Sequence, residues 1–271
     1  MIAVAALAAG CPGVEADPKK SQTRLDLARD FFTRNEMEAA EAEANKALGF
    51  MPRNDEAHNL LGLIELTRAV NTQKDLEVAG CLTGLDAEAL RSEVDRRLEN
   101  AAGHFRRAAA ISDEYGEAWS NVGTVALLQG DPDLGKTAFE KALAAPVRLE
   151  NPGLTRAHLG WAYFAKNDLV SAFKELRQAL QFQPGMCVAT YRLGRVYFAR
   201  EEWENAAEQF QEVIDQPTCR SQEAALYLMK ARLEQGLLDD ARAAQAACVV
   251  LAPASCVAAE CRTASFAGGA R

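Results

Sequence analysis

The segment 130–137 has the residue pattern of a phosphate-binding loop. It reads Gly-Asp-Pro-Asp-Leu-Gly-Lys-Thr, so two glycines precede a lysine and a threonine that could contact phosphate oxygens and magnesium. That chemistry needs a β-strand before the first glycine and backbone amides aimed at the phosphates. Residues 118–128 instead have a helical period, and the two aspartates of the segment would repel a phosphate. We therefore predict a turn between two helices at Gly130, with no nucleotide and no cofactor bound.

Residue types that hold metals or act as nucleophiles are scattered along the chain. His58, His104 and His158 have no ligand spacing, and we assign them to separate structural units as packing or groove residues. No two cysteines have the two-residue gap of a zinc or redox motif, and no serine has the strand–turn–helix setting of a nucleophile elbow. Because nothing assembles a nucleophile, a base and an oxyanion site, we expect neither a metal site nor an enzyme.

The start of the chain has the features of a secretion signal. Residues 1–10 carry no charged or polar side chain and are followed by Cys11 and Pro12. An apolar run this short cannot span a bilayer as a helix, but it suits the apolar region of a signal peptide. The alternative is a buried N-terminal helix ending at Cys11, for which the polar residues 15–22 offer no packing pattern. We therefore expect a signal peptide over 1–10 and a linker over 11–20.

The order Leu-Ala-Ala-Gly-Cys at 7–11 resembles the lipobox of bacterial lipoproteins, in which cleavage before the cysteine leaves a lipid-modified N-terminus. The resemblance implies that Cys11 carries the lipid and anchors the protein to a membrane. A residue other than aspartate after the cysteine, here Pro12, implies sorting to the outer membrane. No Lys or Arg precedes the apolar run, which leaves a start upstream of Met1 open.

Composition favours an all-helical protein that avoids nucleic acid. The 271 residues are 49% hydrophobic, which is enough for a sizeable core. Alanine is abundant and β-branched runs are few, as is typical of helices. The net charge of -8 would repel the phosphates of nucleic acid, so we expect no nucleic-acid partner.

A pattern of small and large residues returns after about 34 residues in the second half of the chain. Each copy has two helical periods separated by a polar break, at 165–168 in the first copy, which predicts a helix–turn–helix hairpin. Gly160 and Ala172 are small where the two helices would approach most closely, and Pro184 ends the second helix. The matching residues are Leu159, Gly160, Tyr163, Ala172, Leu176 and Ala179 in one copy and Leu193, Gly194, Tyr197, Ala206, Phe210 and Val213 in the next.

This pattern resembles the tetratricopeptide repeat (TPR). Further copies start near Leu27, Trp119 and Leu228, and another near His58 is interrupted by an insertion over 72–97. The resemblance implies an all-α TPR superhelix, an α-solenoid of about six hairpins over 21–253 with a capping segment over 254–271. The insertion would cover the edge of the second repeat or form a second contact surface.

The cysteines beyond Cys11 are even in number, which suits disulfide bonds in an oxidising compartment. Cys187 and Cys219 should lie on neighbouring hairpins, and we predict that they pair. Cys248 could reach Cys256 or Cys261 on a following cap helix, and we predict Cys248–Cys261. The alternative is that these cysteines fill alanine-like positions in helix packing, Cys248 above all.

In a TPR superhelix the first helices of the hairpins line the concave face. The repeat register places the following residues there: Ser120, Asn121, Thr124, Leu128, Ala157, His158, Trp161, Phe164, Tyr191, Arg192, Arg195 and Phe198. Aromatic rings with two arginines suit an extended peptide or a helix, with Arg192 and Arg195 meeting a carboxylate or backbone carbonyls. The arginines resemble part of the carboxylate clamp of some TPR modules. The alternative for Trp161 and Phe164 is packing between adjacent hairpins.

A lipid-anchored, acidic array of TPR hairpins resembles the pilotins of type IV pilus systems, of the PilF and Tgl type. The resemblance implies a periplasm-facing outer-membrane scaffold that binds secretin subunits and promotes their assembly for pilus biogenesis and twitching or gliding motility. Two alternatives stay open: a TPR lipoprotein scaffold for outer-membrane protein insertion or polysaccharide export, and a nucleotide-dependent enzyme that uses the Gly130 segment.

Overall fold

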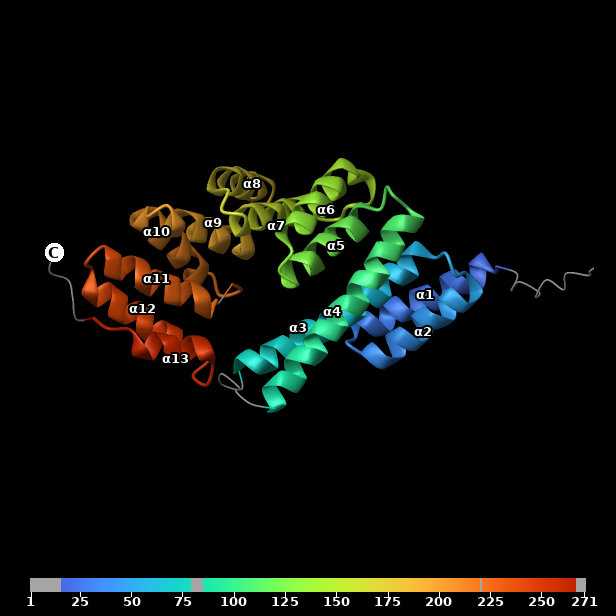
Figure 1. The fold of residues 1–271 in the computed structure, drawn as a ribbon, viewed down its shortest axis with the longest axis horizontal. Helices are drawn as coiled ribbons and strands as arrows, with labels where there is room; N and C mark the ends of the chain where they lie inside the picture. Colours follow the sequence, from blue (N-terminus) through green and yellow to red (C-terminus); the bar gives the residue numbers. More distant parts are fainter. Residues whose placement is uncertain (1–15, 79–84, 220, 267–271) are drawn as a thin grey trace, which may run out of the picture.

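The structure is a computed structural model that describes residues 16–78, 85–219 and 221–266. Within these ranges the chain is helical and contains no β-strand, which confirms the all-α TPR prediction. Six antiparallel hairpins follow one another and a short helix closes the series (Figure 1). The predicted signal peptide and Cys11 lie outside the described residues.

The hairpins have the following bounds. They are α1 (Pro18–Thr33) with α2 (Met37–Phe50), α3 (Asp55–Val78) with α4 (Leu85–Ile111), α5 (Gly116–Leu128) with α6 (Pro132–Ala144), α7 (Pro152–Ala165) with α8 (Leu169–Phe182), α9 (Cys187–Ala199) with α10 (Trp203–Asp215), and α11 (Gln222–Glu234) with α12 (Leu238–Leu251). A 3-10 turn, η1 (Pro146–Arg148), precedes α7, and α13 (Cys256–Thr263) lies in the predicted capping segment. Because α1 begins at Pro18, the predicted linker over 11–20 ends inside the first turn of a helix.

One glycine in each of four hairpins lets the two helices touch. A Cβ added there would lie far inside van der Waals distance of a large side chain on the second helix. At Gly194, for example, it would lie 2.7 Å from Cε1 of Phe210. The four pairs are Gly62 with Phe105, Gly123 with Phe139, Gly160 with Leu176, and Gly194 with Phe210. The small-and-large pattern in the sequence is therefore the contact between paired helices.

The tight turns inside the hairpins share one backbone feature. The turns of hairpins 1, 3, 4, 5 and 6 each contain a residue with positive φ, which ends the first helix and reverses the chain. These residues are Asn35, Gly130, Asn167, Glu201 and Gly236, with φ between 60° and 78°. Side-chain caps start two of the second helices, α6 and α8; in α8, Asp168 accepts from the amide of Ser171.

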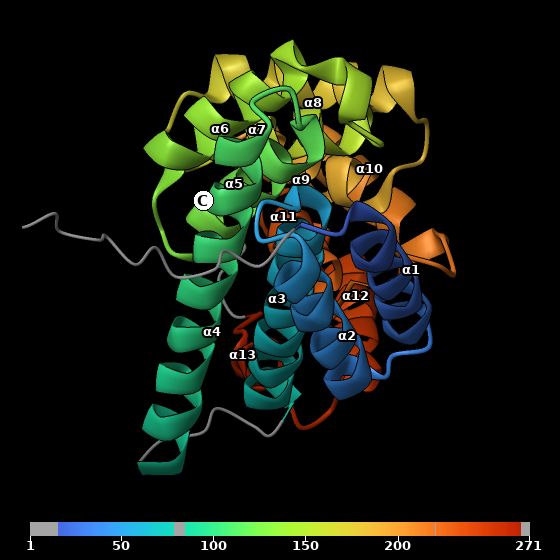
Figure 2. The ribbon, with the colours of Figure 1, turned by 90° about the vertical axis from the view of Figure 1, so that its right-hand side faces the viewer.

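Hairpin 2 is about twice as long as the others because the predicted insertion continues both of its helices. Helix α3 has 24 residues and α4 has 27, against 13 or 14 in most other hairpin helices. Residues 72–78 and 85–97 of the predicted insertion therefore add turns to the two helices of an existing hairpin. Figure 2 shows α4 running from beside α5 to the far end of the molecule. The extension also brings α3 into contact with α13, so hairpin 2 and the C-terminal cap meet across the curve.

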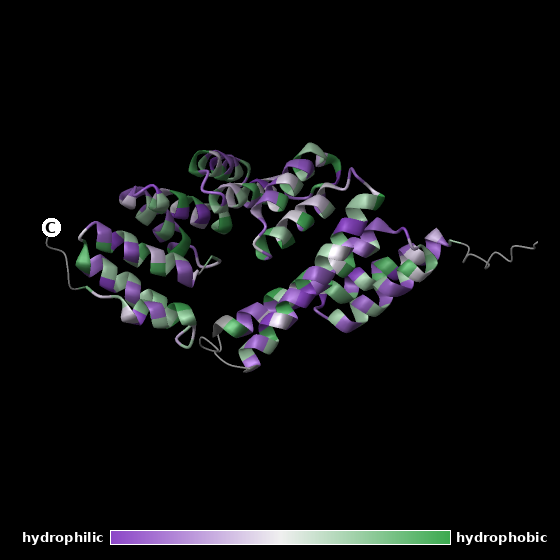
Figure 3. Ribbon diagram, in the orientation of Figure 1, coloured by the Kyte–Doolittle hydropathy of each residue, from purple (hydrophilic) through white to green (hydrophobic). Residues whose placement is uncertain are grey.

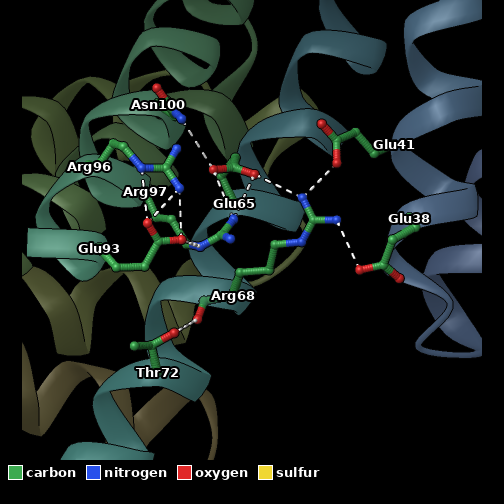
Figure 4. Close-up of polar contacts among 9 residues, drawn as sticks. All are labelled: Glu38, Glu41, Glu65, Arg68, Thr72, Glu93, Arg96, Arg97 and Asn100. Carbon is green, nitrogen blue, oxygen red and sulfur yellow. Dashed lines mark hydrogen bonds and ion pairs between the residues drawn. The ribbon is translucent and has the colours of Figure 1, made fainter. Parts of the chain in front are cut away.

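A charged network holds the long hairpin to its neighbour (Figure 4). Glu65 on α3 accepts hydrogen bonds from Arg68 at 3.0 Å and from Arg97 of α4 at 3.3 Å. The amide of Asn100 also donates to Glu65, at 3.3 Å. Arg68 reaches α2 through Glu41 at 2.6 Å. Because Glu65 is nearly buried and meets several donors, this carboxylate links α2, α3 and α4.

Two disulfide bonds join the cysteine pairs favoured by the repeat register. Cys187 and Cys219 have a Cα–Cα distance of 5.4 Å and enclose hairpin 5. Cys248 and Cys261 have a Cα–Cα distance of 6.4 Å and fasten α13 to α12. Cys256 is disulfide-bonded as well, so it is not the partner of Cys248.

Hydrophobic and hydrophilic residues alternate along the helices (Figure 3). No helix in the described part of the chain combines the length and the apolar character needed to cross a membrane. The buried side chains form small clusters along the array, each shared by neighbouring hairpins, as expected of a solenoid.

Candidate peptide-binding groove

The first helices of the hairpins lie on the inside of the curve. Helix α5 contacts α7, α7 contacts α9 and α9 contacts α11, so these helices run side by side from one hairpin to the next. Neighbouring repeats approach most closely on the concave side of a superhelix. We therefore take α5, α7, α9 and α11 as the floor of the groove.

Two arginines on α9 lie among aromatic rings from three hairpins. Trp161 and Phe164 of α7 are stacked, with ring centroids 4.6 Å apart and planes 8° from parallel. The guanidinium of Arg195 lies 5.6 Å from each of these ring centroids. It also lies 3.9 Å from the ring centroid of Tyr227 on α11. We define the arginine–aromatic cluster as His158, Trp161, Phe164, Tyr191, Arg192, Arg195, Phe198 and Tyr227.

Arg195 is oriented by a tyrosine on its own helix. Its Nη1 donates to the hydroxyl of Tyr191 at 3.0 Å. Burial raises the pKa of Tyr191, so the phenol stays protonated at neutral pH. The rings on either side attract the cation through their π faces and restrict its motion.

Arg192 is held by a histidine instead of an acid. Its Nη1 lies 3.0 Å from Nδ1 of His158, whose ring is stacked on Phe139 with centroids 5.6 Å apart. Burial, with a smaller contribution from Arg192, lowers the pKa of His158 to about 3, so the imidazole is neutral and Nδ1 accepts the hydrogen bond. Burial also lowers the pKa of Arg192 to about 10, which leaves it charged at neutral pH.

No ion pair joins Arg192 or Arg195 to a carboxylate among the residues that the structure describes. Two arginines elsewhere in the chain do have carboxylate partners. Arg148 pairs with Asp55 at 2.7 Å, and Arg156 pairs with Glu175 at 2.9 Å. The cluster therefore presents two cations that form no ion pair in the described ranges, and the acid whose charge acts on the neighbouring Tyr191 is Glu223 of α11.

Hairpin 3 supplies less of the groove than the register predicts. The side chain of Asn121 is buried and donates to Asn59 of α3 at 3.0 Å, so its amide joins hairpins 2 and 3. The hydroxyl of Thr124 donates to the carbonyl of Ser120 in its own helix at 3.0 Å. Leu128, in contrast, is 52% exposed and remains free to contact a partner.

For Trp161 and Phe164, the alternative prediction of packing between adjacent hairpins also holds in part. Both are half-buried and lie between hairpins 4 and 5 beneath the arginines, so they pack between hairpins while they border the groove. Phe198 packs edge-on against Trp203 and Tyr227, with centroids 4.9 and 5.3 Å away.

Two features were missed from the sequence. Tyr227 precedes Leu228 as Arg192 precedes Leu193, so carrying the register into hairpin 6 would have found it. The second feature is an open pocket of about 470 Å³ beside the C-terminal end of α5. It is lined by Ala69, Val70, Gln73 and Lys74 of α3, Val94 and Leu98 of α4, and Leu128. The extension of hairpin 2 creates this pocket, and a repeat pattern cannot predict it.

The expected placement of the histidines was wrong. His58 and His104 belong to the same hairpin, and their ring centroids are 5.8 Å apart. Burial lowers the pKa of both, which favours neutral packing residues. In the described part of the chain no group of three His, Cys, Asp or Glu side chains is arranged to hold a metal ion.

The phosphate-loop pattern lies in a hairpin turn, as the sequence predicted. The residues before Gly130 are helix α5, and Gly130 has φ of 78°. Asp131 caps α6 by accepting from the amide of Leu134 at 2.9 Å, so a carboxylate occupies the place where the motif would need a phosphate.

Comparison with known proteins supports the repeat assignment. The tetratricopeptide repeat family profile matches residues 191–255. Curated protein sequences give no significant match. Among solved structures, PilW, described as a widely conserved type IV pilus biogenesis factor, is 20% identical with a TM-score of 0.71 over 90% of this chain and 98% of that chain.

PilF of Pseudomonas aeruginosa is 14% identical with a TM-score of 0.66, over 90% of this chain and 97% of its own. YrrB, described as a TPR protein with an unusual peptide-binding site, is 16% identical with a TM-score of 0.50, over 82% of this chain and 98% of its own. Likeness at these identities concerns the fold, and this chain folds as a tetratricopeptide-repeat superhelix similar in architecture to PilW and PilF.

Proposed function

We propose that this protein is a lipid-anchored scaffold of type IV pilus biogenesis that holds a client polypeptide in its concave groove. The observation that carries the proposal is the arginine–aromatic cluster, in which two arginines on the first helices of the hairpins form no ion pair among the described residues. The likeness to PilW supports the pathway, because it extends over nearly the full length of both chains. Rings and guanidiniums together suit a polypeptide, and no cofactor is needed.

The proposed client is the secretin, in the manner of a pilotin. Stacked rings would receive apolar client side chains, and the guanidiniums would fix their orientation. A lipid on Cys11 would keep the complex at the outer membrane, on its periplasmic side, and raise the local concentration of secretin subunits until they assemble. The contribution is binding and placement, without a catalytic step.

Capture from cross-linked cell envelopes tests the client. The full chain should retain secretin, and Trp161→Ala should reduce retention because the stacked pair with Phe164 is lost. Phe182→Ala is the matched control, since this ring is 61% exposed on a second helix outside the cluster. Capture of a barrel protein or an export component in place of secretin would instead support a scaffold in outer-membrane protein insertion or polysaccharide export.

The anchor needs a separate test. Labelling with a palmitate analogue should mark the wild-type chain and fail with Cys11→Ser, which should also leave the outer-membrane fraction. A Cys11→Ser protein that stays in that membrane would contradict the lipid anchor and leave the groove proposal standing.

A further inference from the structure

Arg192 and Arg195 form no ion pair with a carboxylate in the described part of the protein, although burial makes an unpaired charge costly. Arg148, in the turn η1 between hairpins 3 and 4, and Arg156, on α7, have carboxylate partners. Neutral groups, His158 and Tyr191, hold the two guanidiniums instead. Neutral neighbours thus position the two cations, which is an arrangement suited to binding an anion.

The spacing of the two arginines allows one anion to contact both. Arg192 and Arg195 are three residues apart on α9, so their side chains leave the same face of the helix about one turn apart. Each has used one Nη1 hydrogen on a neutral neighbour. The remaining guanidinium hydrogens suit the two oxygens of a planar carboxylate.

The surroundings indicate which anion. Trp161, Phe164 and Tyr227 surround the guanidiniums with apolar ring surface. A phosphate group, with its larger charge and hydration, gains little from such walls, whereas an acidic side chain with apolar neighbours matches both the charge and the rings. The overall net charge of -8 also disfavours a polyanionic ligand.

The position of the cluster along the groove indicates a side chain within a segment, not a chain terminus. Trp161 lies on hairpin 4 and Tyr227 on hairpin 6, so ring surface continues on both sides of the arginines of hairpin 5. A segment that passes through would use both sides, whereas a terminal carboxylate would leave one of them empty.

We propose that Arg192 and Arg195 together bind the carboxylate of an internal Asp or Glu of the client, next to an apolar or aromatic client residue. The proposal rests on the proposed groove and names the client chemistry that it selects. His158 and Tyr191 act as positioning residues, because each holds a guanidinium without contacting the client carboxylate itself.

The test uses an array of randomised peptides that are acetylated and amidated, so that no terminal charge is present. Binding to the full chain should favour peptides with one Asp or Glu beside an apolar residue over the same peptides with Asn or Gln. The preference should be roughly ten- to a hundredfold, the range of a charge-assisted hydrogen bond pair. Arg192→Gln and Arg195→Gln should each remove most of this preference.

Arg177→Gln is the matched control, because this arginine is exposed on α8, outside the cluster, and its loss changes the net charge equally. Thermal unfolding followed by circular dichroism shows which variants are folded, and Arg195→Gln keeps the test open if Arg192→Gln unfolds. An unchanged acid preference in a folded Arg192→Gln or Arg195→Gln variant would overturn the inference. A stronger preference for free C-termini, or displacement by inorganic phosphate, would overturn it as well.

The outcomes separate this inference from the proposed function. If the array shows the acid preference but secretin is not captured, the carboxylate site stands and the client is wrong. If secretin is captured in a way that needs Trp161 but no arginine, the client stands and the carboxylate site is wrong.

Discussion

Nη1 of Arg192 lies 3.0 Å from Nδ1 of His158, so a neutral imidazole fixes a guanidinium on the concave face of a TPR superhelix. The pair joins hairpins 4 and 5, because His158 is on α7 and Arg192 is on α9. A carboxylate in place of His158 would form an ion pair with Arg192 and neutralise its charge within the protein. The histidine orients the arginine and leaves its charge available.

His158 should make stability depend on pH. Its pKa is about 3 in the folded state and near the ordinary value of 6.5 in the unfolded chain, so between these values the unfolded chain binds a proton that the folded chain does not. Stability should therefore fall as pH drops from about 7 to about 5, by about 2 kcal/mol from this residue. His158→Gln keeps a hydrogen-bond acceptor and should flatten the slope measured by urea unfolding.

The remaining slope of that variant has a known source. His58 and His104 also have pKa values lowered by burial, so both proteins should lose some stability on acidification. The difference between the two slopes isolates His158. Equal slopes would contradict a neutral, buried imidazole at this position.

The glycine contacts predict opposite effects on stability for glycine-to-alanine changes at two positions. Gly194→Ala would place a Cβ 2.7 Å from Phe210, which must shift or force the helices apart, so we expect a loss of about 1–3 kcal/mol of unfolding free energy. Gly103→Ala in α4 meets no heavy atom within 4 Å and should stabilise its helix by up to about 1 kcal/mol. Urea unfolding of both variants is the measurement, and a Gly194→Ala protein as stable as wild type would show that the hairpin does not need this contact.

The disulfides predict a mass difference and a stability difference. Unfolding in reductant should add about two mass units for each bridge broken, and peptide mapping should connect Cys187 with Cys219. Replacing both by serine should cost about 3 kcal/mol, because the bridge encloses hairpin 5 and restricts the unfolded chain. Free thiols at both positions in protein purified without reductant would exclude the bridge.

The sequence predicted the parts of the fold that repeat and failed where repeats interact unequally. Gly160 and Leu176 follow the period, so the hairpin contact could be predicted from spacing alone. Asn121 follows the same register, yet its amide bonds Asn59, because the neighbouring hairpin offers a polar partner there and buries it. Neighbours of this kind depend on how two hairpins are packed, and a single repeat does not encode that.

Hairpin 2 also has features that the repeat pattern could not predict. An interruption of the period predicted an insertion over 72–97, but its helical spacing could not tell two longer helices from a separate element. The register could have identified Tyr227, although hairpin 6 has Met229 where hairpins 2 to 5 have glycine and so matches the pattern poorly. The open pocket beside Leu128 depends on the length of α3 and α4, which the repeat does not set.

The pocket beside Leu128 predicts a second anchor for the client. Leu128 is 52% exposed at the C-terminal end of α5 and lines the open pocket together with the buried Val94 and Leu98, so a client side chain in the pocket would cover Leu128. Leu128→Glu would bring a charge to this surface and should weaken client binding at least about tenfold by fluorescence anisotropy. Unfolding free energy should change by less than about 0.5 kcal/mol, because an exposed position is altered. Leu134→Glu, at an exposed position on the second helix α6, is the matched control and should leave binding unchanged. Equal binding by both variants would restrict the client to hairpins 4 to 6, where the arginines lie.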